Sequence, residues 1–125
     1  MEPNVQAQAK PIKIPGPTHP ISVERNLAHI VVKVAGRIIA DTRDALTLSE
    51  SHYPAVQYIP RKDVDMTLLA RSDHTTYCPY KGDASYFSIP LGGERSIDAV
   101  WTAVADIKDR LAFYSDRVDA IDIRS

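Results

Sequence analysis

The stretch that decides the fold is His29–Val34, with the sequence HIVVKV, followed by Ala35-Gly36-Arg37 and then by Ile38-Ile39-Ala40. Its β-branched residues favour extended backbone, because their branched side chains pack well on the pleated surface of a sheet. A glycine between two such runs is typical of a tight hairpin. We therefore predict two antiparallel strands joined at Gly36.

Further strands are predicted on the C-terminal side of this hairpin. Ala45–Glu50 (ALTLSE) alternates apolar and polar residues, as half-buried strands do. Strand composition also marks the segments Ala55–Ile59, Val64–Leu69, Ala84–Pro90, Ser96–Trp101 and Arg117–Ile123. Between them, Arg71–Gly82 is polar and turn-prone, and Gly92-Gly93 predicts a second hairpin turn. Short strands at this regular spacing predict a mainly β fold, namely a small β-barrel or sandwich.

One segment near the C-terminus fits two structures. Ile97, Val100, Trp101, Val104 and Ile107 follow helical spacing, but the residues up to Trp101 also suit a strand returning from Gly92-Gly93. We predict a strand to about Thr102, followed by one short helix over Ala105–Arg110.

The two ends of the chain differ in composition. Five of the nine prolines lie in the first twenty residues, and proline fixes φ and lacks an N–H. Residues 1–18 are therefore expected to form an extended arm, and residues 19–125 a single β-rich domain. The first ten residues lack the apolar stretch of a secretory signal, and no apolar run reaches the roughly 20 residues needed to cross a bilayer. We expect a cytoplasmic protein with no membrane partner.

Charge and cysteine content exclude other classes. Fifteen basic and sixteen acidic residues give a net charge of −1, so nothing predicts a nucleic-acid partner. A single cysteine, Cys78, excludes an internal disulfide and a multi-thiolate zinc site. Accordingly no metal and no cofactor are expected, although His52 and His74 with a carboxylate form a weaker metal-site hypothesis. The oligomeric state and the ligand are left open.

Several motifs carry a family resemblance. They are Tyr58–Val64 (YIPRKDV), Thr76–Gly82 (TYCPYKG) and Ala84–Tyr86 (ASY), together with Ala112–Tyr114 (AFY) further on. They resemble a bacterial family catalogued as domain of unknown function 427, over roughly residues 19–123. The resemblance implies a tent-like β-barrel, related in shape to methionine sulfoxide reductase B and the ligand-binding domain of cereblon. Some catalogues also label this family as nucleotidyltransferases.

The residues around the CPYKG motif suggest a ligand pocket. Arg61 follows Pro60 at a strand end, and Lys81 precedes Gly82, which permits close approach of a ligand to the backbone. Tyrosines stack on planar groups, and arginine binds carboxylate or phosphate. We predict a binding site for a small anionic or planar polar ligand, and its residues are Tyr58, Arg61, Cys78, Lys81, Tyr86 and Glu50. Both cations also fit plain surface pairs with Asp63 and Asp83.

Two other functional classes stay open. The protein is an enzyme if Cys78 or Lys81 is the reactive group, because the nearby ammonium lowers the pKa of a thiol. Magnesium-dependent nucleotidyl transfer requires clustered carboxylates, for which the candidates are Asp63 with Asp65 and Asp119 with Asp122. The third class is a protein-interaction module, which would expose an apolar patch. Trp101 is expected in the core, with a ligand platform as the alternative.

Overall fold

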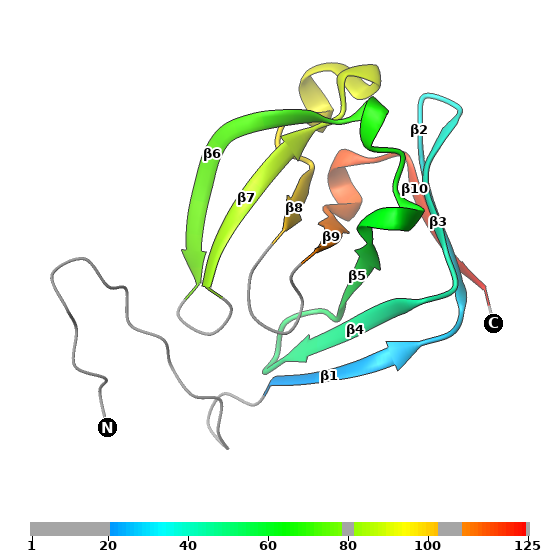
Figure 1. Ribbon diagram of the computed structural model, residues 1–125, viewed down its shortest axis with the longest axis vertical. Helices are drawn as coiled ribbons and strands as arrows, with labels where there is room; N and C mark the ends of the chain where they lie inside the picture. The colour runs from blue at the N-terminus through cyan, green and yellow to red at the C-terminus, as the bar shows by residue number, and fades with distance from the viewer. Residues whose placement is uncertain (1–20, 79–81, 103–108, 125) are drawn as a thin grey trace, which may run out of the picture.

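The computed structural model describes residues 21–78, 82–102 and 109–124, which form two antiparallel sheets (Figure 1). The larger sheet has the order β1-β4-β5-β9-β8-β7-β6 and the smaller one the order β10-β2-β3. The strands of the larger sheet are β1 (Ile21–Asn26), β4 (Ala45–Glu50), β5 (Val56–Pro60), β6 (Ala70–Cys78), β7 (Gly82–Ser88), β8 (Val100–Thr102) and β9 (Arg110–Phe113). Those of the smaller sheet are β2 (His29–Val34), β3 (Arg37–Thr42) and β10 (Ala120–Arg124). The prediction of a mainly β fold is confirmed.

Short 3-10 helices connect several of these strands. They are η1 (Arg61–Asp63), η2 (Met66–Leu68), η3 (Pro90–Ser96) and η5 (Ser115–Arg117). The larger sheet is strongly curved, with β1 and β4 at one end and β6 and β7 at the other (Figure 1). In the described residues β1 and β6 remain its edges, so the sheets do not close into a barrel. Nor does any helix of the described part have the length and apolar character needed to span a membrane.

The hairpin predicted around Gly36 is confirmed. β2 and β3 pair in antiparallel fashion, with Val34 opposite Arg37. The two residues between them, Ala35 and Gly36, have φ values of 52° and 75°. Two successive positive φ values define the turn whose twist matches that of the flanking strands, and glycine adopts one of them without steric cost.

The main core lies between the two sheets. Alternate residues of β2 are buried, and Ile30, Val32 and Val34 pack against the larger sheet. The larger sheet contributes buried side chains from its central strands, among them Phe87, Val100, Leu111 and Phe113. A second, smaller cluster of Leu48, Tyr58 and Ala112 forms on the opposite face of the larger sheet. This sheet is therefore apolar on both faces.

The hairpin predicted at Gly92-Gly93 is wrong. Both glycines lie in η3, and the return strand β8 begins only at Val100. The physical reason is a local network: the backbone N–H of Gly92 donates to Ile89 at 2.9 Å, and the buried hydroxyl of Ser96 donates to the carbonyl oxygen of Arg117 at 2.7 Å. These bonds coil the segment and attach it to η5.

Two further predictions fail in opposite directions. The strand expected over Val64–Leu69 is instead a bridge at Val64 followed by η2, because the Asp65 carboxylate accepts the backbone N–H of Thr67 and caps a helical turn. Conversely, the polar segment from Arg71 belongs to β6, which pairs with β7 across an irregularity between Arg71 and Thr75. Pairing with a neighbouring strand decides here, since local composition does not favour a strand.

The last strand and the predicted helix also need correction. β10 begins at Ala120, because residues Ser115–Arg117 coil into η5. Arg110, the predicted last residue of the helix, is the first residue of β9. Positions 103–108, which hold most of that helix, lie outside the described residues.

A Gly92→Ala substitution tests the packing of η3. A Cβ at this position would lie 1.9 Å from the Oγ atom and 2.5 Å from the Cβ atom of Ser96. We expect the free energy of unfolding to fall by about 1–3 kcal/mol, because Ser96 must move and its buried hydrogen bond to Arg117 weakens. Urea unfolding of Gly92→Ala, Ser96→Ala and the double variant measures this. Unaltered stability in Gly92→Ala, or strictly additive losses, would contradict the proposed coupling.

Candidate functional site

A cavity of about 810 Å³ lies at the junction of the two sheets. The smaller sheet lines it with β-branched side chains of β2 and β10, and the larger sheet lines it from β4, β5, β8 and the end of β9. Its walls are Ile30, Val32, Leu48, Glu50, Tyr53, Pro54, Ala55, Val56, Gln57, Ile59, Trp101, Phe113, Tyr114, Ser115, Ile121 and Ile123. Tyr53 and Ile123 are more than half exposed, so they border its opening.

The cavity forms because β5 and β9 stay paired over a short distance only. Their register partners are Ile59 with Leu111 and Pro60 with Arg110. Toward the start of β5, Val56 and Gln57 line the cavity instead of continuing this ladder, as does Phe113 at the end of β9. The larger sheet thus opens locally, and the cavity reaches residues of both of its faces.

Four aromatic side chains lie next to one another on the face that carries the smaller cluster. This aromatic row consists of Tyr58, Trp101, Tyr114 and Tyr86. The indole N–H of Trp101 donates to the Tyr58 hydroxyl at 3.0 Å, and the Trp101 and Tyr114 rings lie 4.4 Å apart. The Tyr114 and Tyr86 hydroxyls share a hydrogen bond of 3.5 Å. The row thereby positions Trp101 and Tyr114, which also form part of the cavity wall.

The ionisation of the Tyr114 phenol is clearly perturbed. Burial, followed by the hydrogen bond to Tyr86, raises the pKa of Tyr114 from 10.0 to about 12. The Arg117 guanidinium, 4.7 Å from the centre of the ring, acts in the opposite direction. Tyr114 is therefore neutral throughout the physiological pH range, where it serves as a hydrogen-bonding group.

Three of the six predicted binding residues share one face of the larger sheet. Tyr86 is the register partner of Trp101, and Leu46 that of Tyr58. Because side chains alternate along a strand, Glu50 lies on the same face of β4 as Leu46. Glu50 lines the cavity and is 9% exposed. Tyr58 and Tyr86 are buried in the aromatic row and do not line the cavity themselves. They are hydrogen-bonded to Trp101 and Tyr114, which form part of the cavity wall.

The two predicted cations, Arg61 and Lys81, are not seen beside Tyr58, Tyr86 and Glu50. Arg61 is exposed in η1, with its guanidinium 5.8 Å from the centre of the Phe87 ring. Phe87 follows Tyr86 in β7 and so points to the other face of the sheet, away from the aromatic row. Lys81 lies outside the described residues, and Cys78 is described only through its backbone at the end of β6.

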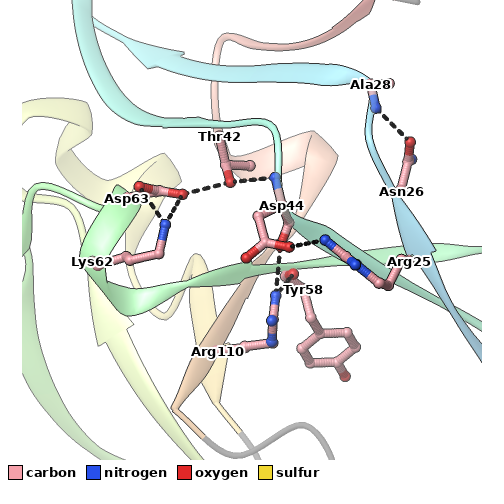
Figure 2. Close-up of polar contacts among 9 residues, drawn as sticks. All are labelled: Arg25, Asn26, Ala28, Thr42, Asp44, Tyr58, Lys62, Asp63 and Arg110. Atoms are coloured by element: carbon pink, nitrogen blue, oxygen red, sulfur yellow. Dashed lines mark hydrogen bonds and ion pairs between the residues drawn. The ribbon is translucent and has the colours of Figure 1, made fainter.

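The aspartates considered for magnesium binding make separate local contacts. Asp63 accepts from Thr42 at 2.7 Å and from Lys62 at 3.2 Å (Figure 2). Asp65 caps η2, as described above. In the described part of the chain, no three His, Cys, Asp or Glu side chains gather where they could hold a metal ion.

The C-terminal pair of aspartates is similarly occupied. Asp119 accepts from the backbone N–H of Ala35 and from Arg95, at 2.7 and 2.8 Å, while Asp122 lies 3.9 Å from Lys33. These contacts attach the β2–β3 turn and η3 to the C-terminal strand. Asp119 and Asp122 therefore have a structural role in these contacts.

Most of the cavity wall was missed by sequence reasoning. The wall is assembled from segments that no short motif connects, and among its unpredicted residues are Tyr53, Val56, Gln57 and Tyr114. Trp101 was expected in the core, and it is half-buried at the cavity, with its N–H bonded to Tyr58. The alternation of Leu46, Leu48 and Glu50 was the one available signal, since it places a carboxylate on an otherwise apolar strand face.

The fold and the site together define a two-sheet antiparallel β domain with a largely apolar cavity. A family model described as domain of unknown function (DUF427), and labelled NTP_transf_9, matches residues 22–124. The chain therefore belongs to the DUF427 family, as its motifs predicted. No curated protein matches the chain.

The raised pKa of Tyr114 predicts a specific alkaline behaviour. Above pH 10 the unfolded chain releases the Tyr114 proton while the folded chain retains it, so stability falls as the pH rises from about 10 to about 12. Tyr114→Phe should remove this contribution. We expect its free energy of unfolding to decline less between pH 9 and pH 11 than that of the wild type, measured by urea unfolding. Parallel curves for the two proteins would show that Tyr114 titrates normally.

Proposed function

We propose that this protein is a small-ligand-binding β domain whose ligand occupies the cavity at the junction of the two sheets. The observation that carries the proposal is the cavity itself. Its volume of about 810 Å³ falls in the range of small-molecule sites, and its wall is mostly apolar with a few polar groups. This proposal keeps the small-ligand hypothesis from the sequence and centres the site on Glu50 and Trp101. A tent-like arrangement of the sheets over the cavity is part of the same proposal.

The composition of the wall favours a ligand with a flat or bulky apolar body. Trp101, Phe113 and Tyr53 offer aromatic surfaces, and aromatic side chains contribute much of the energy of such contacts. Gln57 and Ser115 provide neutral hydrogen-bonding groups in the wall. In the described residues, Gln57 also accepts from Asn26 at 3.0 Å and from Thr47 at 2.8 Å, which holds its amide in place. A side chain held in this way orients a ligand with little loss of its own entropy.

A cavity-filling substitution tests the proposal. Val56 lines the cavity from β5, so Val56→Phe should occupy part of the space and weaken ligand binding at least tenfold. The probe is a library of small planar aromatic molecules. Binding is followed by the fluorescence of Trp101, the only tryptophan in the chain, and by NMR chemical shifts.

The matched control is Val23→Phe. Val23 is a 40% exposed residue of β1 that is not part of the cavity wall, and the same change there should leave binding unaltered. Thermal melts establish that both variants are folded. Equal binding by Val56→Phe and the wild type, or shifts confined to residues away from the cavity, would refute the proposal.

A further inference from the structure

The side-chain amide of Gln57 is oriented by hydrogen bonds from two neighbouring strands. Its Oε1 atom accepts from Asn26 Nδ2 of β1 at 3.0 Å and from the Thr47 hydroxyl of β4 at 2.8 Å. Asn26 is itself oriented, because its Oδ1 atom accepts the backbone N–H of Ala28 at 3.0 Å (Figure 2). A backbone N–H can only donate, so Nδ2 is the end of Asn26 that faces Gln57. The atom of Gln57 that receives this bond is therefore the oxygen.

The same bonds leave the nitrogen end of this amide unused. Nε2 carries two hydrogen atoms, and in the part of the chain that the structure describes it donates neither of them. Nor is Nε2 buried, because Asp98 Oδ1 is the one buried polar side-chain atom without a partner in the described residues. Gln57 thus presents free N–H donors on a half-buried side chain.

Strand alternation directs the Gln57 side chain toward the space between the two sheets. Gln57 and Ile59 are two residues apart in β5, so their side chains leave the same face of the larger sheet. Ile59 packs in the main core with Ile30 and Val32 of the smaller sheet. All four residues line the cavity. The Oε1 atom is engaged by β1 and β4, whereas the ladder from β5 to β9 begins only at Ile59 and leaves the other side of Gln57 unpaired.

A free N–H donor beside an apolar wall discriminates between ligands. A carbonyl oxygen that leaves water needs a new donor, because an unpaired buried acceptor costs free energy. A hydrocarbon at the same place would leave Nε2 without a partner once the ligand had displaced water from it. Sites built to hydrogen-bond one group of a ligand therefore reject the analogue that lacks this group. In the same wall, Trp101 and Phe113 suit a flat apolar body.

We infer that the cavity binds a flat molecule with a carbonyl oxygen, and that Gln57 selects it by donating from Nε2 to that oxygen. This inference rests on the proposed function and adds the hydrogen-bond acceptor that the ligand carries. The oxygen is bound by a neutral amide, whereas the sequence predicted the cations Arg61 and Lys81.

Two molecules of nearly equal shape test this selection. 1-Indanone carries a carbonyl group on a flat bicyclic ring, and 1-methyleneindane has a CH2 group in place of the oxygen. Each is titrated into the wild-type protein and followed by Trp101 fluorescence and by the NMR signals of the Gln57 side-chain NH2 group. We expect 1-indanone to shift these signals, because their protons enter a new hydrogen bond, and 1-methyleneindane to leave them almost unchanged.

Two variants locate the donor. Gln57→Glu keeps an oxygen that accepts from Asn26 and Thr47 but replaces the free NH2 group by a second oxygen, while Gln57→Met removes the donor without adding a charge. The measured quantity is the affinity for 1-indanone divided by that for 1-methyleneindane. Both variants should lower this ratio at least about tenfold relative to the wild type, as the loss of a hydrogen bond to a buried acceptor would give.

The matched control is Thr75→Met. Thr75 is an exposed, uncharged residue of β6 outside the cavity wall, so this change should leave the ratio unaltered. Thermal melts show whether each variant is folded. If either Gln57 variant does not fold, the other variant and the NH2 signals of the wild type still decide the question.

The outcomes separate this inference from the proposed function. If the folded Gln57 variants keep the wild-type ratio, or if 1-indanone binds without shifting the Gln57 NH2 signals, the selection by Gln57 is wrong. Binding of both molecules in the cavity would then still support the proposed function. A fall of the ratio in Thr75→Met as large as in the Gln57 variants would also overturn the inference. If neither these two molecules nor the planar library perturbs Trp101, the proposed function and the inference are both refuted.

Discussion

The larger sheet depends on the pairing of β9 with its two neighbours. This strand, Arg110–Phe113, joins β5 on one side and β8 on the other, so it connects the strands β1, β4 and β5 to β8, β7 and β6. Leu111 and Ala112 are completely buried, one on each face of the sheet. Burying a leucine of this kind stabilises the fold by roughly 1.5–3 kcal/mol. The guanidinium of Arg110 also donates to the carbonyl oxygen of Asp44 at 2.7 Å, which attaches β9 to the β3–β4 turn (Figure 2).

The same joint explains why a cavity exists. The ladder between β5 and β9 consists of two register pairs, and beyond it the side chains of Val56 and Phe113 line open space. Longer pairing would place the two strands side by side and fill this space with backbone. The aromatic row supports this part of the wall, because the Trp101 N–H is bonded to Tyr58 and the Trp101 ring packs against Tyr114. The cavity is thus a consequence of how the sheet is assembled.

Local structure accounts for residues that look catalytic in the sequence. Asp65 caps η2, and Asp63 accepts a hydrogen bond from the Thr42 hydroxyl. Asp119 accepts hydrogen bonds from the backbone N–H of Ala35 and from the Arg95 guanidinium. Such short-range roles are common for aspartate, whose side chain competes well for nearby backbone and hydroxyl donors. A pair of aspartates in a sequence is therefore weak evidence for metal-assisted chemistry until their side chains are seen to converge.

The sequence by itself determined the features that depend on neighbouring residues. The β-branched run of β2, the turn at Gly36 and the alternation of β4 follow from local backbone preference and side-chain period, and all three are present in the structure. The motifs around CPYKG were also sufficient to predict the family. The alternation of β4 placed Glu50 on the apolar face, where it lines the cavity.

Only the tertiary structure decided the rest, because the forces concerned act between distant segments. β6 is a strand because β7 pairs with it, and Gly92 lies in a helical turn because Ser96 is bonded to Arg117. The sequence could not show that Glu50 lines the cavity while Arg61 lies over the Phe87 ring. Each side chain takes its direction from its own strand or turn, and the positions of these elements are set by tertiary packing. The lining of the cavity likewise depends on which side chains the strands and their connections bring together, and that is a property of the assembled fold.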